Sequence, residues 1–413
     1  MQTNKRHSVA TKQPASGSHS GRGPVVWPTA LLLGTTLLLA IVGVPWYQLA
    51  VGFEWTHWLA FALFAATNGI AITAGYHRLW AHNAYKAHPI MRLLLALFGA
   101  AAFQNSILVW SSQHRRHHRH VDDNERDPYS AKKGLWFSHI GWMLHEYPNG
   151  ADDFSNCKDL QRDKIVMWQH KHYYSIAIAM NVLPPLLFGF ITGEYLAYFL
   201  TMGILRLVYS HHTTFFINSL AHYWGKRPYC GDNTARDNDV LALFTYGEGY
   251  HNYHHLFQND YRNGVRWYQF DPTKWLIKTC SWLGLAKDLR VTPKFKIREA
   301  MVTRQLEVAR DKLANPTFIN TIKQRLGTIE YARWREALEN QIESEHQQLS
   351  LLLNEWKDIH AKWMTAKRER LQSAKQNVQS SLDLHGLKLK LKELEYSMIQ
   401  QYRRVSYVNV VLA

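Results

Sequence analysis

Four long apolar segments organise the first two thirds of the chain. Residues 29–52 and 57–76 follow each other closely, and residues 173–193 and 195–217 form a second such pair. A helix needs about 20 consecutive apolar residues to cross the hydrocarbon core of a bilayer, because each residue advances it by about 1.5 Å. The pattern therefore predicts two membrane hairpins and four transmembrane helices.

A fifth apolar stretch, residues 90–110, is interrupted by the polar triplet 104–106. A full crossing there would place His82 and His114, which flank it, on opposite faces of the membrane. If these histidines serve one site, the segment must lie in the membrane or dip into it without crossing.

The charges flanking the first hairpin predict its orientation. Four basic residues precede the first span, and His77-Arg78 follows the second; the four are Lys5, Arg6, Lys12 and Arg22. Basic flanks lie on the cytoplasmic side of membrane proteins. All histidine-rich segments are then expected in a cytoplasmic helical cap, with residues 1–27 as a disordered basic tail and residues 28–295 as the membrane domain.

From about residue 296 the chain is dominated by Lys, Arg, Glu, Gln and Leu. Apolar residues recur there every seven positions, at Ile342, Leu349, Trp356 and Trp363. This period is typical of a helical hairpin or a short coiled coil. Residues 296–413 are therefore predicted to form a helical extension that packs on itself or supports self-association.

Composition narrows the class of protein. The formal net charge is +16, which suits nucleic acid or an anionic membrane surface, and the apolar spans favour membrane lipids over nucleic acid. The mean hydropathy is only −0.31, so the apolar residues are concentrated in the spans. The three cysteines are far apart, which argues against a disulfide framework, an iron–sulfur cluster or a zinc ribbon.

Histidines gather beside the apolar segments. His251, His254 and His255 are spaced i, i+3 and i+4, and so share one face of a helix. The pattern occurs again at His114, and two further histidines are spaced by five; the full set of candidates is His77, His82, His114, His117, His118, His222, His251, His254 and His255. On an ideal helix a spacing of five separates side chains by about 140°, so that pair shares a metal only if the helix ends or distorts.

Nine imidazoles exceed the four protein ligands of one zinc ion, so the set indicates two metals sharing a site. Histidine-rich shells suit zinc, copper, iron or nickel. Open coordination positions beside apolar spans indicate O₂ activation on a lipid-like substrate more than hydrolysis. Carboxylates follow the second cluster, either as partners of imidazole N–H groups or as a solvated turn: Asp122, Asp123, Glu125 and Asp127.

The chain resembles the membrane fatty acyl desaturases, most closely the acyl-CoA Δ9 branch that includes stearoyl-CoA desaturase, and is expected to be of a bacterial type. Six stretches match in order and spacing between about residues 30 and 290: Gly75 to His82, Phe103 to Asn105, His114 to His118, Phe137 to Trp142, Asn218 to His222 and Gly247 to His255.

The resemblance implies a dinuclear iron centre that uses O₂ and two electrons to introduce a cis double bond into an acyl chain. One iron would take His77, His82, His114, His118 and His254. The other would take His117, His222, His251 and His255, with Asn218 holding a water on it.

Two departures from the family concern the acyl carrier. Ser112-Gln113 stands where family members commonly carry Arg-Asp, and His145-Glu146 replaces a basic pair. Both CoA and phospholipid therefore stay open as carriers. Residues 296–413 contain no haem motif and no cysteine cluster, so a separate ferredoxin- or cytochrome-type donor with its reductase is expected. The expected location is a bacterial inner membrane, with the active site on the cytoplasmic face.

Two other functions are compatible with these patterns. A related membrane hydroxylase would share the iron chemistry and insert oxygen into the acyl or alkyl chain. A membrane-anchored interaction protein would use its C-terminal helices and keep the histidines for structure.

Overall fold

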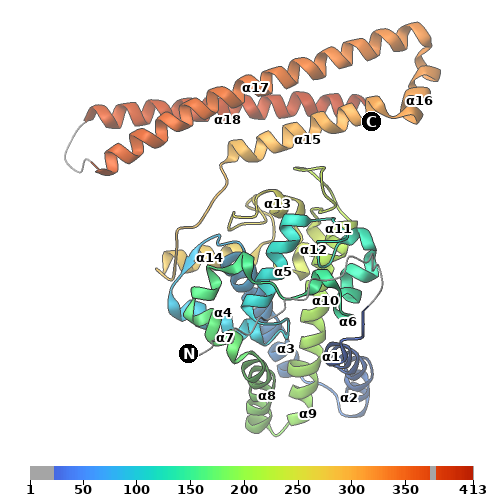
Figure 1. The fold of residues 1–413 in the computed structure, drawn as a ribbon, viewed down its shortest axis with the longest axis vertical. Coiled ribbons are helices and arrows are strands. Elements are labelled where there is room, and N and C mark those ends of the chain that lie inside the picture. Colours follow the sequence, from blue (N-terminus) through green and yellow to red (C-terminus); the bar gives the residue numbers. More distant parts are fainter. Residues whose placement is uncertain (1–22, 373–377, 413) are drawn as a thin grey trace, which may run out of the picture.

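The computed structural model describes residues 23–372 and 378–412, and the chain is mostly helical (Figure 1). Residues 1–22 of the expected disordered tail lie outside the described residues. Residues 23–26 were assigned to that tail, but the structure pairs them with the cap. The amide of Gly23 donates to the carbonyl of Glu146 at 3.1 Å, and Val25 forms an antiparallel bridge with His145.

The first expected hairpin consists of two long apolar helices, Trp27–Ala50 and Trp55–Ala81. Each combines α-helical and π-helical turns: α1 (Trp27–Leu38), η1 (Leu39–Gly43) and α2 (Val44–Ala50), then α3 (Trp55–Ile70) and η2 (Ala71–Ala81). The second helix therefore continues past the expected end at Tyr76 and includes His77.

The second hairpin begins with α8 (Tyr173–Thr192), which ends at Gly193 in the left-handed conformation, with φ of 82°. The chain returns as one continuous helix built from three pieces, α9 (Tyr195–Tyr198), η8 (Phe199–Leu205) and α10 (Arg206–Asn218). Among the described residues, three helices are long and apolar enough to cross a membrane, and this returning helix is not one of them. It carries Arg206 and several polar residues, which lower its hydropathy.

The stretch 90–110 is not one helix. It forms α4 (Pro89–Ala100), a turn, and then α5 (Ile107–His120). With 12 residues, α4 is too short to cross a bilayer alone, as the polar triplet led us to expect.

Residues 111–172 and 219–293 are called the cap here. They contain the end of α5 and a set of shorter helices. These shorter helices are η3 (Ala131–Lys133), η4 (Phe137–Gly141), α6 (Trp142–Leu144), η5 (Pro148–Gly150), η6 (Ser155–Cys157), η7 (Leu160–Arg162), α7 (Lys164–Lys171), α11 (Leu220–Tyr223), α12 (Asp239–Phe244), α13 (His251–Leu256) and α14 (Pro272–Trp282). Strand β1 (Lys86–Ala87) pairs antiparallel with β2 (Ala286–Lys287).

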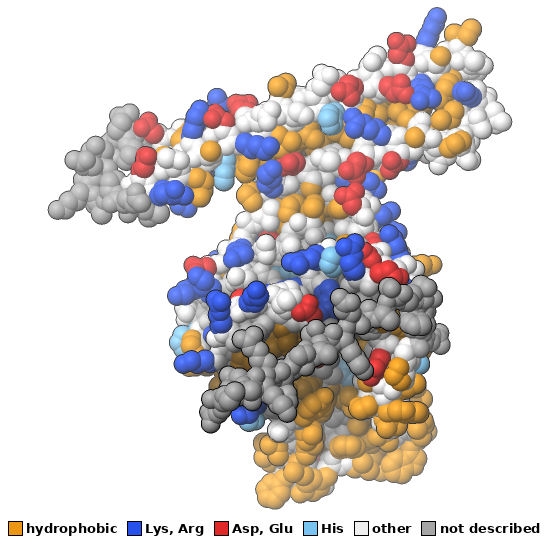
Figure 2. Space-filling model, in the orientation of Figure 1, with side chains coloured by type: hydrophobic (Ala, Val, Ile, Leu, Met, Phe, Trp, Pro, Cys, Tyr) orange, Lys and Arg blue, Asp and Glu red, His pale blue; other side chains and the backbone are white. Residues whose placement is uncertain are grey.

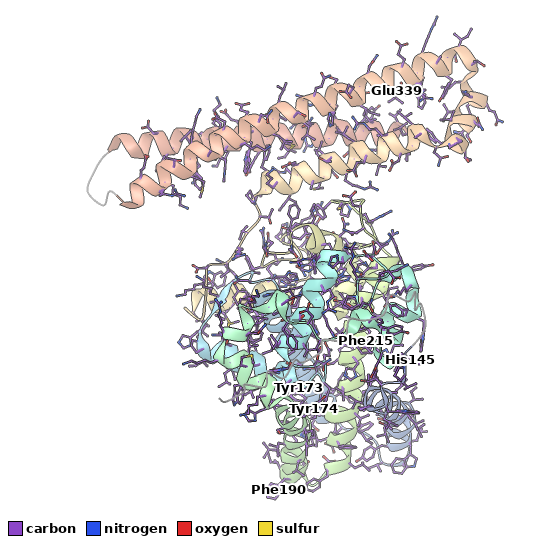
Figure 3. The ribbon with its side chains drawn as sticks, viewed as in Figure 1. His145, Tyr173, Tyr174, Phe190, Phe215 and Glu339 are labelled. Carbon is purple, nitrogen blue, oxygen red and sulfur yellow. The ribbon has the colours of Figure 1, made fainter. Side chains whose placement is uncertain are left out.

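Hydrophobic side chains cover the lower part of the molecule in Figure 2, whereas charged side chains gather over the upper part. The exposed apolar residues there include Leu38 and Ile41 of the first helix and Phe190 and Ile191 of α8. A contiguous exposed apolar surface of this kind is typical of contact with lipid. Figure 3 places Tyr173 and Tyr174 at the cap end of α8 and Phe190 at the opposite end.

The last four helices pack on one another: α15 (Lys294–Ala314), α16 (Pro316–Leu326), α17 (Thr328–Gln372) and α18 (Val378–Val411). Ile342, Leu349 and Trp356, three of the residues with period seven, are buried in their common core, and Trp356 stacks on Phe295 at 4.8 Å between ring centroids. Glu345 interrupts the second apolar register of α17, which includes Leu338 and Ile359, and it is buried against Arg404, with Nε and Oε1 2.6 Å apart.

Candidate metal centre

His77 lies on η2, whose backbone is a π-helix, and His82 is the residue directly after its end. The amide of His82 donates to the carbonyl of His77 at 3.1 Å, the i to i+5 bond that defines this wider helix. Residues five apart then lie nearly above one another, and the two imidazole rings are 4.8 Å apart between centroids. This local distortion is what lets a spacing of five serve one site.

The second histidine cluster lies on α5. The hydroxyl of Ser106 caps the start of this helix by accepting a bond from the amide of Val109 at 3.4 Å. His114, His117 and His118 follow on its last turns, and their i, i+3, i+4 spacing directs the imidazoles to one side.

The third cluster lies on α13, which has only six residues and depends on contacts outside the helix. The carboxylate of Asp237 accepts a bond from the amide of Tyr253 at 3.0 Å, near the start of the helix. This contact orients the turn that carries His251, His254 and His255.

His222 lies on α11, and its Nε2 is 3.1 Å from Nε2 of His251. Asn218, the last residue of α10, lines the cavity beside the site. A water held by Asn218 stays a prediction.

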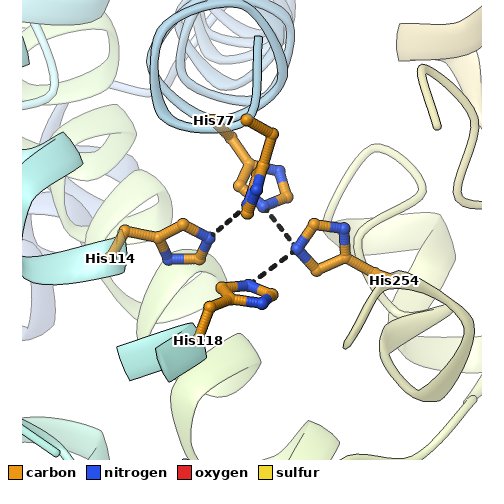
Figure 4. Close-up of side chains that lie close together, drawn as sticks. His77, His114, His118 and His254 are labelled. Atoms are coloured by element: carbon orange, nitrogen blue, oxygen red, sulfur yellow. Dashed lines mark hydrogen bonds between the residues drawn. The ribbon is translucent and has the colours of Figure 1, made fainter. Parts of the chain in front are cut away.

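The structure brings all nine histidines together in two groups (Figure 4 labels four residues of the first group). Within each group, one nitrogen per residue lies within 4.8 Å of the others; the groups are His77, His82, His114, His118 and His254, and His117, His222, His251 and His255. These are the two sets that the resemblance implied. His118 and His255, from different groups, stack face to face at 4.3 Å.

The nitrogens converge in a way that suits cations. Nε2 of His254 lies 2.9 Å from Nε2 of His77 and 3.0 Å from Nε2 of His118. A neutral imidazole carries one N–H, so converging nitrogens include lone pairs that no hydrogen satisfies. One metal ion in each group would satisfy them, and the residues present therefore fit two metals.

Burial keeps these imidazoles ready to bind metal. It lowers the pKa of His114 well below its ordinary value, and the neighbouring imidazoles, first His77, lower it further. The pKa is lowered for the same reasons in His82, His118, His222, His251, His254 and His255. These side chains are accordingly neutral near pH 7, the form that ligates metals.

The carboxylates after the second cluster divide into two roles. Asp127 is buried, and its carboxylate lies 2.9 Å from Nδ1 of His117. Asp122 acts through Thr234: it accepts a bond from the hydroxyl of Thr234, and that hydroxyl lies 2.8 Å from Nδ1 of His222. Asp123 instead bonds the amide of Glu125 within an exposed turn. Both interpretations of this acidic run therefore apply, to different residues.

Glu248 is a site residue that sequence reasoning missed, although it lies within a matched stretch. Its Oε2 is 2.8 Å from Nδ1 of His77, and its Oε1 accepts from Nη2 of Arg78 at 2.8 Å. Arg78 also contacts Asp271 at 3.1 Å, and all these side chains are buried. The signal was a carboxylate three residues before a histidine cluster, but only folding identifies His77 as its neighbour.

A cavity of about 650 Å³ lies beside the first histidine group and is lined by residues of the long helices and of the cap. Its lining includes Leu32, His77, His114, Tyr173, Thr214 and Ile217. A largely apolar cavity beside nitrogens that could hold a metal suits a hydrocarbon substrate.

The residues that depart from the family lie at this cavity or behind its wall. Ser112 is buried and donates to the side chain of Asn156 at 2.9 Å, whereas Gln113 lines the cavity. His145 and Glu146 also line it, and Nδ1 of His145 lies 3.0 Å from the carbonyl of Gly23.

Comparison with known proteins agrees with this site. The family model for fatty acid desaturases matches residues 53–285, which include all nine histidines. The chain belongs to the fatty acid desaturase family.

Particular relatives are acyl-CoA desaturases by name. The chain is 44% identical over 284 residues to a probable acyl-CoA desaturase of Schizosaccharomyces pombe, covering 68% of this chain and 58% of that protein. It is 39% identical to acyl-CoA desaturase 1 of Saccharomyces cerevisiae, covering 67% of this chain and 56% of the yeast protein. It is 36% identical to human stearoyl-CoA desaturase 5, covering 69% of this chain and 87% of the human protein. The chain thus spans less than two thirds of the two yeast proteins.

Proposed function

We propose that this protein is an O₂-dependent acyl-CoA desaturase with two iron ions, which introduces a cis double bond at the Δ9 position of a saturated acyl chain. The observation that carries the proposal is the pair of histidine groups beside a largely apolar cavity. The names of the relatives support CoA as the carrier, and a phospholipid-bound chain is the alternative that the experiment below distinguishes.

The nine histidines would hold the iron, and Asn218 would hold a water. Iron bound there supplies the activation of O₂. The overall reaction removes two hydrogens from the acyl chain and takes two electrons and two protons from outside, so that O₂ becomes two waters and one carbon–carbon double bond forms.

The residues of the cavity would orient the substrate. Its largely apolar walls would exclude water and hold the chain beside His77 and His114. A methylene group offers no hydrogen bond, so the depth of the cavity selects the carbon atom.

For the topology, we propose that the returning helix, residues 195–218, is a fourth span. The groups that Arg206 contacts reduce the free-energy cost of placing its charge in the membrane. Four spans leave all the histidines on one face of the membrane. We place that face on the cytoplasmic side of a bacterial inner membrane. A separate ferredoxin- or cytochrome-type donor with its reductase would supply electrons, and the C-terminal helices offer a surface for self-association.

The test is expression in a membrane host, with mass spectrometry of double bonds in the CoA and phospholipid pools and metal analysis of the purified protein. We expect new cis-Δ9 chains, first in the CoA pool, and two irons per chain. His254→Ala should abolish both the double bonds and the iron binding. His120 lies outside the two histidine groups, so His120→Ala should leave double bonds and iron unchanged. A hydroxylated product without an alkene would show a hydroxylase, and less than about one iron per chain, with His254→Ala harmless, would refute the metal centre.

A further inference from the structure

Helix α4 ends in the interior of the protein, packed against α3, α8 and the returning helix. Ala101, the residue after its last turn, is fully buried and packs with Phe64 of α3 and Met202 of η8. The last carbonyls of a helix have no partner within it, and an unpaired carbonyl in the hydrocarbon region costs several kcal/mol. The end of α4 therefore needs donors from other elements.

Arg206 supplies one of them. Its Nη1 donates to the carbonyl of Ala101 at 2.8 Å, and its Nη2 donates to the side chain of Asn181. Asn181 in turn donates to the same carbonyl of Ala101 at 3.0 Å. The guanidinium also lies 4.7 Å from the ring centroid of Phe64. Arg206 thus has partners for its charge and needs no carboxylate.

Two further side chains complete this end of the helix. Asn68 of α3 donates to the carbonyl of Phe98 at 2.7 Å, and Nε2 of His211 lies 2.8 Å from the carbonyl of Ala102. Polar side chains from α3, α8 and the returning helix therefore converge on the end of α4.

The turn that follows links this end to the site. Phe103 and Asn105 have positive φ angles of 50° and 72°, and Gln104 donates to the hydroxyl of Thr214 at 3.0 Å. Residues 103–105 line the cavity, and α5 begins two residues later and carries His114. This segment therefore forms part of the cavity wall, whereas the start of α5 is held by bonds of its own: the amide of Ile107 donates to the side chain of Gln169 at 3.1 Å, and the hydroxyl of Ser106 lies 2.7 Å from Nδ1 of His170.

We propose that Arg206, together with Asn181, is a positioning residue that sets where the acyl chain lies relative to the two histidine groups, and so which carbon is desaturated. The proposal rests on the proposed function. Neither side chain lines the cavity, so both act through the carbonyl of Ala101 and the turn 103–105. Losing the bonds to the carbonyl of Ala101 moves the cavity wall, while every imidazole stays in place.

The test compares Arg206→Met, Arg206→Lys and Asn181→Leu with the wild type. Double-bond position is measured by mass spectrometry, iron per chain by metal analysis, and the unfolding midpoint by heating the protein in detergent. We expect Arg206→Met to keep its iron but to raise the share of chains desaturated at neighbouring carbons about tenfold, the size of a one-methylene discrimination. Arg206→Lys retains one donor for the carbonyl of Ala101. Most of its product should therefore carry the double bond at the wild-type position.

Thr201→Val is the matched control, because the buried Thr201 bonds only the carbonyl of Ala197 in its own helix. It should lower stability slightly and leave product position unchanged. Should Arg206→Met fail to accumulate, Arg206→Lys and Asn181→Leu decide the question. Wild-type product position in the variants that fold, or an equal shift in Thr201→Val, would overturn the proposal. A wild-type protein that makes no unsaturated chain would instead overturn the proposed function, and this proposal with it.

Discussion

Nδ1 of His117 and Oδ1 of Asp127 lie 2.9 Å apart, and both side chains are buried. A carboxylate at this distance holds the hydrogen on Nδ1 and leaves Nε2 free for a metal. Asp127 also accepts bonds from the amides of Asp122 and Tyr129. It therefore ties the turn after α5 to the second histidine group.

Asp127→Asn should weaken metal binding by about 10- to 100-fold, because the amide no longer orients His117 as a charged acceptor does. The measurement is competition with a chelator, monitored by metal retained per chain. Asp123→Asn is the matched control, since Asp123 lies in the exposed turn nearby. Equal retention of metal in the two variants would contradict this role for Asp127.

Glu248→Gln should destabilise the fold as well as the metal site. Burial alone would raise the pKa of Glu248, but His77 and Arg78 outweigh it and hold the pKa below its ordinary value, so the carboxylate is charged. Neutralising it leaves Arg78 with one carboxylate partner, Asp271, and breaking a buried pair costs about 3–5 kcal/mol.

The unfolding midpoint in detergent measures this cost. The control is Glu125→Gln. Because Glu125 is exposed, this variant should have the same unfolding midpoint as the wild type. A Glu248→Gln protein with wild-type midpoint and metal content would show that the buried charge is dispensable.

The metal-free protein should lose stability on acidification. Folding lowers the pKa of imidazoles such as His114 and His254, so between those lowered values and about pH 6.5 the unfolded chain binds more protons than the folded chain. Stability from this source is present above about pH 6.5 and falls as the pH drops below it.

Unfolding midpoints of chelator-treated protein from about pH 7.5 to about pH 5.5 test the sign. The iron-loaded protein should resist acid further, until protons displace the metal. A metal-free midpoint that rises on acidification would contradict the pKa directions.

Deleting residues after Ala300 should affect assembly more than chemistry. The shortened chain keeps Ile297, which packs on Tyr253 beside His254, but loses Trp356 from its place against Phe295. We expect lower yield and more aggregation because Phe295 becomes exposed, with product position unchanged. Size-exclusion chromatography and mass spectrometry measure the two effects, and a clear shift in double-bond position would refute the prediction.

The sequence alone predicted the helical class and the three helices that are long and apolar enough to span a membrane. It also singled out the nine histidines that the structure brings together. These features are local, because span length and helical spacing are set by neighbouring residues. The assignment of the histidines to two groups came from the resemblance, and the tertiary structure shows the same grouping.

Only the tertiary structure decided how distant residues cooperate. The π-helical backbone of η2 aligns His77 with His82, which an ideal α-helix would keep apart. Arg78 and Glu248 are 170 positions apart in sequence, and no local pattern joins them. The burial of Arg206 is understood only from the fold. Its guanidinium meets the carbonyl of Ala101, at the end of α4, because the long helices pack together. Buried polar groups must find partners wherever the fold provides them, and sequence spacing holds no record of those contacts.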